Sequence, residues 1–190
     1  MEAAILEELK REAMKLMPSS GTHGLDHTLR VYRTCLTIGA SMGADLSILL
    51  PAALLHDIAR DEEDHEHASS SKAREILKTY NYPQGKIEAV EQAIATHSFT
   101  GKLTPNTLEG KILSDADKLD AIGSIGIYRA AAYSRERGRT IDDFMAHFHE
   151  KLLTLKDVMY TKEAKSLAES RHRFMLEFLE QLSKEREKNS

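Results

Sequence analysis

Apolar side chains recur every three or four residues along most of the chain, which is the spacing of one face of an α-helix. Val31, Cys35 and Met42, for example, fall on one stripe of such a helix. Branched residues nowhere alternate with polar ones at period two, so the pattern predicts no strands. We therefore expect an all-α fold of about eight or nine helices. The expected helices cover 5–17, 25–42, 48–58, 68–80, 83–97, a segment that opens at Thr104-Pro105, 116–137, 140–159 and a long one from 161.

Capping residues and apolar content refine these segments. Thr140 and Thr161 are expected to cap the last two helices, because threonine oxygens accept from the first free backbone N–H groups. Segment 48–58 is the most apolar and is expected to be buried on most sides. The chain has no repeat, low-complexity tract or Pro/Gly-rich linker. This predicts a single domain over 1–190, with a core at about 21–138 and a C-terminal helical extension at about 140–190.

The composition limits the chemistry. Hydrophobic residues make up 41% and charged residues 29% of the 190 residues, which is a globular composition. The net charge of −4 gives no electrostatic basis for binding a polyanion, so no nucleic-acid polymer is expected as a partner. The single cysteine, Cys35, excludes an internal disulfide and a Cys-rich zinc site. Nine histidines instead indicate imidazole chemistry.

The length of the apolar runs bears on the cellular location of the protein. No stretch approaches the roughly 18 uncharged apolar residues that a membrane helix requires. Residues 1–14 carry several acidic and basic side chains, which excludes a secretory apolar core there. We therefore expect a cytoplasmic protein with no membrane partner.

Histidine and aspartate interrupt apolar sequence at three places, residues 23–31, 54–58 and 112–120. His23 and His27 are four residues apart, which places them near one face of a helix. A buried aspartate needs a partner, because burying an unpaired charge costs several kcal/mol. A divalent cation is one such partner, and a mixed His/Asp set favours a borderline first-row ion.

Each of the three places also has a simpler interpretation. A single buried histidine is more often a hydrogen-bonded core residue than a ligand. An aspartate that follows an apolar helix is commonly a cap or a partner for arginine. No segment alone therefore predicts a metal site, and it is their occurrence together, as His, His-Asp and Asp, that resembles a known family.

The chain resembles the HD-domain superfamily of metal-dependent phosphohydrolases, especially its small stand-alone bacterial and archaeal members. The resemblance spans about 21–138 and implies an all-α bundle. It also implies hydrolysis of a phosphoester or phosphoanhydride bond in a small phosphorylated molecule, a nucleotide. Carried over residue by residue, it implies a divalent ion (Mn, Mg, Co, Ni, Fe or Zn) held by His27, His56, Asp57 and Asp117. The matching motifs are Asp26-His-Thr-Leu-Arg-Val31, Leu54-Leu-His-Asp-Ile58 and Ile112-Leu-Ser-Asp-Ala-Asp-Lys-Leu-Asp-Ala-Ile-Gly123.

Two more histidines extend the implied site. His67 and His97 stand where related proteins carry a helix-start histidine and a further ligand. The resemblance therefore implies either a second ion, bridged by Asp57, or a contact with substrate phosphate. The alternative is that His67 only caps its helix, and His65 beside it leaves the register open.

Polar residues near the motifs are candidates for contact with substrate. His23 is placed either to meet phosphate or to hydrogen-bond a metal ligand. Lys118 is placed to meet phosphate and is equally compatible with pairing to a neighbouring aspartate. Some nucleotidase members carry an acidic residue shortly after the His-Asp pair, whereas this chain has Ala59-Arg60. Arg60 is then the phosphate contact, with Asp61 as a weaker acid or base. The side chains expected to order the ligands are Asp26, Arg30 and Asp120.

Three functions are compatible with these residues. The first is the phosphohydrolase, whose pocket walls we expect from residues 98–103 and from the helix at 122–133. The second is a mixed-valent di-iron oxygenase, a class with a similar order of ligands. The third is a non-catalytic ligand-binding module that keeps a metal for stability, which the unbroken set of ligands disfavours.

Overall fold

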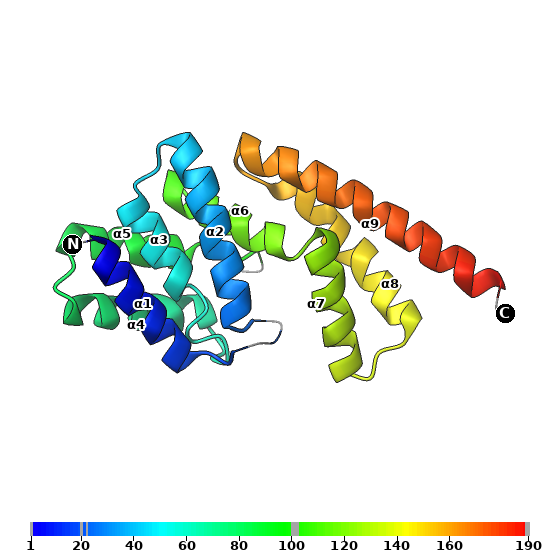
Figure 1. Ribbon diagram of the computed structural model, residues 1–190, viewed down its shortest axis with the longest axis horizontal. Helices are drawn as coiled ribbons and strands as arrows, with labels where there is room; N and C mark the ends of the chain where they lie inside the picture. The colour runs from blue at the N-terminus through cyan, green and yellow to red at the C-terminus, as the bar shows by residue number, and fades with distance from the viewer. Residues whose placement is uncertain (1, 20, 22, 100–102, 189–190) are drawn as a thin grey trace. The chain divides into compact units, whose positions relative to one another are not determined.

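The computed structural model describes residues 2–19, 21, 23–99 and 103–188 (Figure 1). These residues form nine α-helices and one 3-10 helix, without a strand, so the predicted all-α fold is confirmed. Within that part of the chain, no helix combines the length and apolar character needed to cross a membrane. The helices are α1 (Glu2–Leu16), α2 (Leu25–Met42), α3 (Leu46–Leu55), α4 (His65–Thr79), α5 (Gln84–Ala95), α6 (Leu108–Asp120), α7 (Gly123–Glu136), α8 (Ile141–Glu150), η1 (Leu152–Val158) and α9 (Lys162–Lys188).

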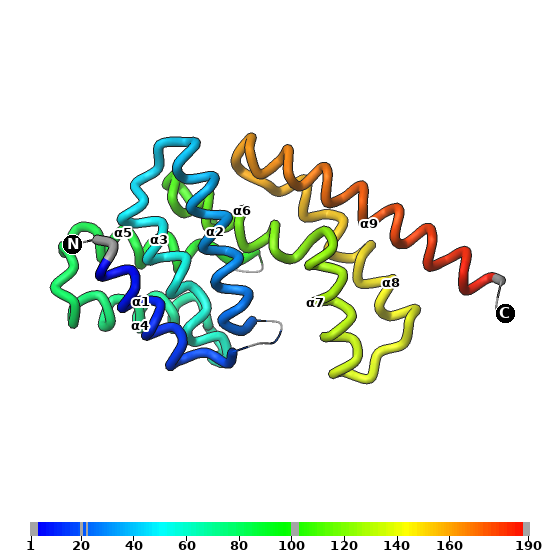
Figure 2. Tube along the Cα trace, in the orientation of Figure 1, coloured from blue at the N-terminus to red at the C-terminus, as the bar shows by residue number. Residues whose placement is uncertain are grey.

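The chain forms two compact units, Met1–Asp117 and Lys118–Ser190. In the first unit α3 packs against α1, α2, α4 and α5, and Figure 2 traces it alongside α2. Every residue of α3 from Leu49 to Leu55 is buried, which confirms the expected burial of the most apolar segment. The first unit is thus built around α3.

A tertiary hydrogen bond compensates for a proline inside α3. Pro51 has no N–H, so it cannot bond the carbonyl of Ser47 four residues earlier. The Tyr82 hydroxyl donates to that carbonyl instead, at 2.6 Å. The helix therefore continues through the core and presents His56 and Asp57 at its buried end.

The second unit contains α7, α8, η1 and α9. The cap predicted at Thr140 is confirmed, because its side chain accepts from the Asp143 N–H. The Asp143 carboxylate accepts from the Thr140 N–H in return, which completes a capping box. Phe144 and Phe148 of α8 and Phe178 of α9 form an aromatic cluster with ring centroids 5.0 to 6.2 Å apart.

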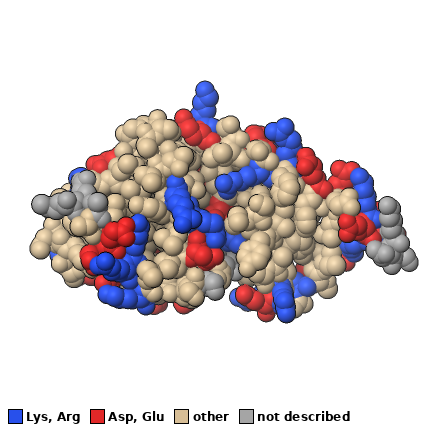
Figure 3. Space-filling view, in the orientation of Figure 1, with Lys and Arg blue, Asp and Glu red and all other residues tan. Residues whose placement is uncertain are grey.

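On the face shown in Figure 3, acidic and basic side chains neighbour each other. A single domain over the whole chain stays a prediction.

The predicted start of the helix at Thr104-Pro105 is wrong. The helix α6 begins at Leu108, because the side chain of Thr107 accepts from the backbone N–H of Gly110 at 3.1 Å. A threonine three positions later than the expected one therefore serves as the cap.

The predicted helix over 116–137 is also wrong, because it is two helices. The first, α6, ends at Asp120, and α7 begins at Gly123. Gly123 has a φ of +77°, a conformation that leaves the right-handed helical path and that glycine adopts at little cost.

We expect Gly123→Ala to destabilise the protein by about 1–2 kcal/mol. The methyl group would sit at positive φ and 2.9 Å from Cγ of Arg171. Urea denaturation followed by circular dichroism measures the change. The control is Gly85→Ala in the first turn of α5, where a methyl group meets no atom within 4 Å and the free energy of unfolding should stay equal or rise. Equal effects of the two substitutions would contradict the argument.

Candidate metal centre

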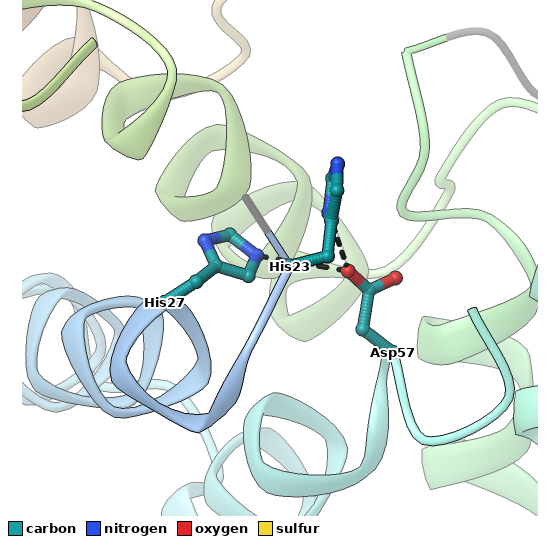
Figure 4. A group of neighbouring side chains, drawn as sticks. All are labelled: His23, His27 and Asp57. Atoms are coloured by element: carbon teal, nitrogen blue, oxygen red, sulfur yellow. Dashed lines mark hydrogen bonds and ion pairs between the residues drawn. The ribbon is translucent and has the colours of Figure 1, made fainter. Parts of the chain in front are cut away.

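Side chains from three parts of the first unit meet at the buried end of α3. His27 lies in the first turn of α2, and His23 lies just before that helix. His56 and Asp57 directly follow α3, and Asp117 comes from α6. Figure 4 shows His23 and His27 directed toward the carboxylate of Asp57. Segments far apart in the sequence thus converge on one point.

The distances define overlapping groups of ligand atoms. His27 Nε2 lies 3.3 Å from His56 Nε2, 3.4 Å from Asp117 Oδ1 and 3.7 Å from Asp57 Oδ2. His97 Nε2 lies 3.9 Å from Asp57 Oδ1. In the described residues, three groups each keep their ligand atoms within 4.8 Å: His23, His27 and Asp57; His27, His56 and Asp117; and His56, Asp57 and His97.

Backbone carbonyls fix the tautomers of two of these histidines. His56 Nδ1 lies 2.9 Å from the carbonyl of Ala53, and His97 Nδ1 lies 2.6 Å from the carbonyl of Ile94. Because a carbonyl only accepts, both Nδ1 atoms carry the proton and donate it. In the neutral ring, the Nε2 lone pairs of His56 and His97 therefore face the group, as ligand atoms must.

Burial and neighbouring charges set the protonation states. Burial lowers the pKa of His56 to about 4, an effect that the Asp57 carboxylate only partly opposes. For Asp57, burial acts to raise the pKa, but His56 and the hydrogen bond from His23 outweigh it and hold the pKa below its usual range. Burial is likewise outweighed at Asp117, where the hydrogen bond that the carboxylate accepts from His27 holds the pKa well below its usual value. At neutral pH the centre therefore combines a neutral His56 with two ionised carboxylates.

The donor set fits a divalent cation. Asp57 Oδ1 is buried and accepts no hydrogen bond from the described residues. An ionised carboxylate oxygen without a hydrogen bond is costly to bury, and the Arg60 guanidinium, whose Nη1 lies 3.5 Å away, only partly offsets that cost, so a bound cation would stabilise it. Imidazole nitrogens with carboxylate oxygens are a mixed set that suits first-row divalent ions. The residues present therefore fit the metal that the sequence implies.

The structure brings His65, rather than His67, to the edge of this group. His67 is exposed on α4, whereas the ring of His65 lies edge-on to His97 with centroids 6.0 Å apart. The reason is the start of α4: Asp64 caps it by accepting from the His67 N–H, so the helix begins three residues before the predicted 68. Positions 69, 70, 73 and 77 are the buried face of α4, and helical spacing back from 69 reaches 65.

Three predicted residues of the first unit, Asp26, Arg30 and Asp61, belong to none of the ligand groups. Arg30 Nη1 donates to Asp26 Oδ2 at 2.9 Å, one turn away on α2. Asp61 is exposed in the turn that follows the His-Asp pair. Of the predicted pocket wall, residues 100–102 lie outside the described residues, and Phe99 and Leu103 on either side are exposed. The roles assigned to all of these stay predictions.

Two predicted residues fall at the start of the second unit and have partners there. Lys118 is buried, and its Nζ lies 4.6 Å from the centroid of the Tyr160 ring. Asp120 Oδ2 accepts from Arg129 Nη1 at 2.8 Å in a buried ion pair. These contacts supply a cation–π and an ion-pair partner, so contact with substrate at Lys118 and orientation of an imidazole by Asp120 stay predictions.

Comparison with known proteins gives a consistent picture. The HD domain family matches residues 24–122, which include His27, His56, Asp57 and Asp117. The chain is 38% identical over 179 residues to Bacillus subtilis YpgQ, covering 90% of this chain and 87% of YpgQ. The crystal structure of YpgQ in complex with ADP matches with a TM-score of 0.84 and 34% identity, over 97% of this chain and 96% of that one. An HD-superfamily hydrolase from Bacillus thuringiensis matches with a TM-score of 0.82 and 34% identity, over 97% of this chain and 98% of that one.

Proposed function

Since this chain belongs to the HD domain family, we propose that it is a metal-dependent phosphohydrolase acting on a nucleotide. The reaction would cleave a phosphoester or phosphoanhydride bond. One observation carries the proposal: the ligand atoms of His27 in α2, His56 at the end of α3 and Asp117 in α6 lie within 4.8 Å of one another, and Asp57 belongs to the two groups that overlap this one. Packing alone does not require such a set, because apolar side chains in a core avoid the free-energy cost of burying polar and charged groups.

His27, His56, Asp57 and Asp117 would hold the ion. A bound divalent cation lowers the pKa of a coordinated water toward about 7 and polarises a phosphoryl oxygen. The chain's own part is to keep the ligands in place and in the right charge state. The carbonyl of Ala53 keeps the His56 ring turned toward the centre, and both carboxylates are ionised at neutral pH because their pKa values are lowered.

A second ion is supported by the group of His56, Asp57 and His97. Asp57 would be the ligand common to both sites, because its Oδ2 lies 3.7 Å from His27 Nε2 and its Oδ1 lies 3.9 Å from His97 Nε2. The proposed second site uses His97 and leaves out the exposed His67.

The nucleotide is supported by YpgQ, whose crystal structure contains ADP. His23 is the ligand-group member best placed for a phosphate, because its ring is 31% exposed while its Nδ1 is bonded to Asp57 at 2.9 Å. Asp57 Oδ2 is an acceptor, so this nitrogen of His23 donates, and the ring is held at the surface of the group (Figure 4).

We expect the purified protein to release phosphate or pyrophosphate from nucleotides in the presence of Mn²⁺, Mg²⁺, Co²⁺ or Ni²⁺. A panel of nucleoside mono-, di- and triphosphates, assayed for both products, measures this. Excess chelator should remove the activity, and restored metal should return it. No release from any nucleotide with any of the four metals contradicts the proposal, and oxygen consumption by the iron-loaded protein without phosphate release favours an oxygenase instead.

A further inference from the structure

Arg60 reaches the metal centre with only one of its nitrogens engaged. Its Nη1 donates to His65 Nε2 at 2.6 Å and lies 3.5 Å from Asp57 Oδ1. Among the described residues, Nε and Nη2 of the same guanidinium have no hydrogen-bond or ion-pair partner, and the side chain is 36% exposed. The open edge is the one that carries two parallel N–H groups.

His65 cannot turn away from Arg60 without losing its own contacts. A guanidinium only donates, so His65 Nε2 is the acceptor and Nδ1 carries the proton. Nδ1 lies 3.2 Å from Glu66 Oε2, and both of these side chains are largely buried. The ring edge also rests against His97. Hydrogen-bonding and ion-pair contacts therefore run from Glu66 to His65 and from His65 to Arg60. They end at the guanidinium beside Asp57.

The backbone under Arg60 is fixed as well. The Arg60 N–H donates to the carbonyl of Asp57 at 3.2 Å, which forms a tight turn after the His-Asp pair. The Ala59 N–H donates to the Ser69 hydroxyl of α4 at 3.1 Å. The turn that carries Arg60 is thus tied to the helix that carries His65.

We propose that Arg60 binds a phosphate group of the substrate through its Nε and Nη2 edge, and that His65 and Glu66 are positioning residues that hold it there. The inference rests on the proposed function and adds the residues that hold the Arg60 side chain in place. Two parallel N–H groups match two oxygens of one phosphate, and a guanidinium fixed in advance loses less side-chain entropy on binding. The ligand is thus a phosphate group that lies next to the centre.

The contact with Asp57 does not by itself account for this arrangement. An arginine that served only to neutralise Asp57 would gain most from a paired, bidentate contact. Here a single nitrogen faces Asp57, at 3.5 Å, while the shorter bond goes to His65. Fixing Nη1 on a histidine leaves the bidentate edge available for an anion.

Calorimetric titration of the Mn²⁺-loaded protein with ADP, and separately with inorganic pyrophosphate, tests the proposal without turnover as the readout. We expect Arg60→Ala to raise the Kd by about 30-fold and His65→Leu by about tenfold, as for loss of a charged hydrogen bond. His65→Gln keeps an acceptor oxygen and should recover part of the loss. The matched control is His67→Leu, an exposed neighbour on the same helix, which should bind as the wild type does.

The double variant Arg60→Ala/His65→Leu separates positioning from an independent role of His65. If His65 acts through Arg60, the double variant binds no more weakly than Arg60→Ala. Additive losses, or equal losses in His65→Leu and His65→Gln, would overturn the positioning role of His65. A lower Mn²⁺ stoichiometry in both His65 variants would overturn it as well and make His65 a metal ligand. Absence of ADP and pyrophosphate binding by the wild type overturns it too. The proposed function fails separately, when the wild type binds these ligands but hydrolyses no nucleotide.

Discussion

Asp57→Asn is expected to lower kcat/KM for metal-dependent nucleotide hydrolysis by more than a thousandfold and to abolish tight binding of the divalent ion. Asp57 belongs to two of the three ligand groups and contacts His23, His27, His56 and His97. Asparagine keeps the shape of the side chain and removes its charge. A thousandfold loss corresponds to about 4 kcal/mol of transition-state stabilisation, which is within what a bound cation supplies.

The substitution should leave the protein folded. An asparagine carbonyl oxygen can still accept the hydrogen bond from His23, and the side-chain volume is unchanged. Mn²⁺ titration by calorimetry, nucleotide hydrolysis and circular dichroism are measured on the same preparation. The matched control is Glu63→Gln, which removes one acidic charge from the exposed turn that follows. Wild-type Mn²⁺ stoichiometry together with activity within tenfold of wild type in Asp57→Asn would refute Asp57 as a ligand.

The elements of the first unit were predictable where local chemistry decides them. The apolar run of α3 made its burial predictable, and the order of His27, His-Asp and Asp117, through its resemblance to the HD-domain superfamily, implied one site. The structure brings those side chains together, while their part in binding metal stays a prediction. The bond from Tyr82 to the carbonyl below Pro51 was not predictable, because it joins residues 35 positions apart in the chain.

The errors arose where one residue sets the phase of a helix. The continuous helix over 116–137 breaks because Gly123 takes a positive φ, which composition does not reveal. The preference for His67 over His65 depended on where α4 starts, and Asp64 settles that by capping it. A shift of two positions on a helix rotates a side chain by more than half a turn, from the centre to the exposed side.

Acid is expected to destabilise the metal-free protein through His56. The pKa of His56 is about 4 in the folded protein, because the ring is buried, against about 6.5 in the unfolded chain. Between these values the unfolded chain binds a proton that the folded protein does not, so the free energy of unfolding falls as the pH falls. The loss between pH 7 and pH 4.5 should be about 2–3 kcal/mol from this residue. Asp57 and Asp117, whose pKa values are lowered, add to the loss mainly below that range.

Urea denaturation at half-unit pH steps, with chelator present throughout, measures this loss. The comparison is His56→Asn, whose side-chain N–H group can replace the donor to the Ala53 carbonyl but does not titrate. This variant should be less stable at pH 7, because it leaves space in the core, yet its stability should fall more slowly on acidification. Histidines with lowered pKa outside the centre, such as His147, act in both proteins alike, so the difference in slope reports His56 together with the carboxylates whose pKa values it lowers. The free energy of unfolding of the wild type could instead be constant from pH 7 to 4.5, or parallel to that of His56→Asn. Either result would mean that His56 takes up a proton in the folded protein without a free-energy cost, and would refute the inference that its imidazole is neutral.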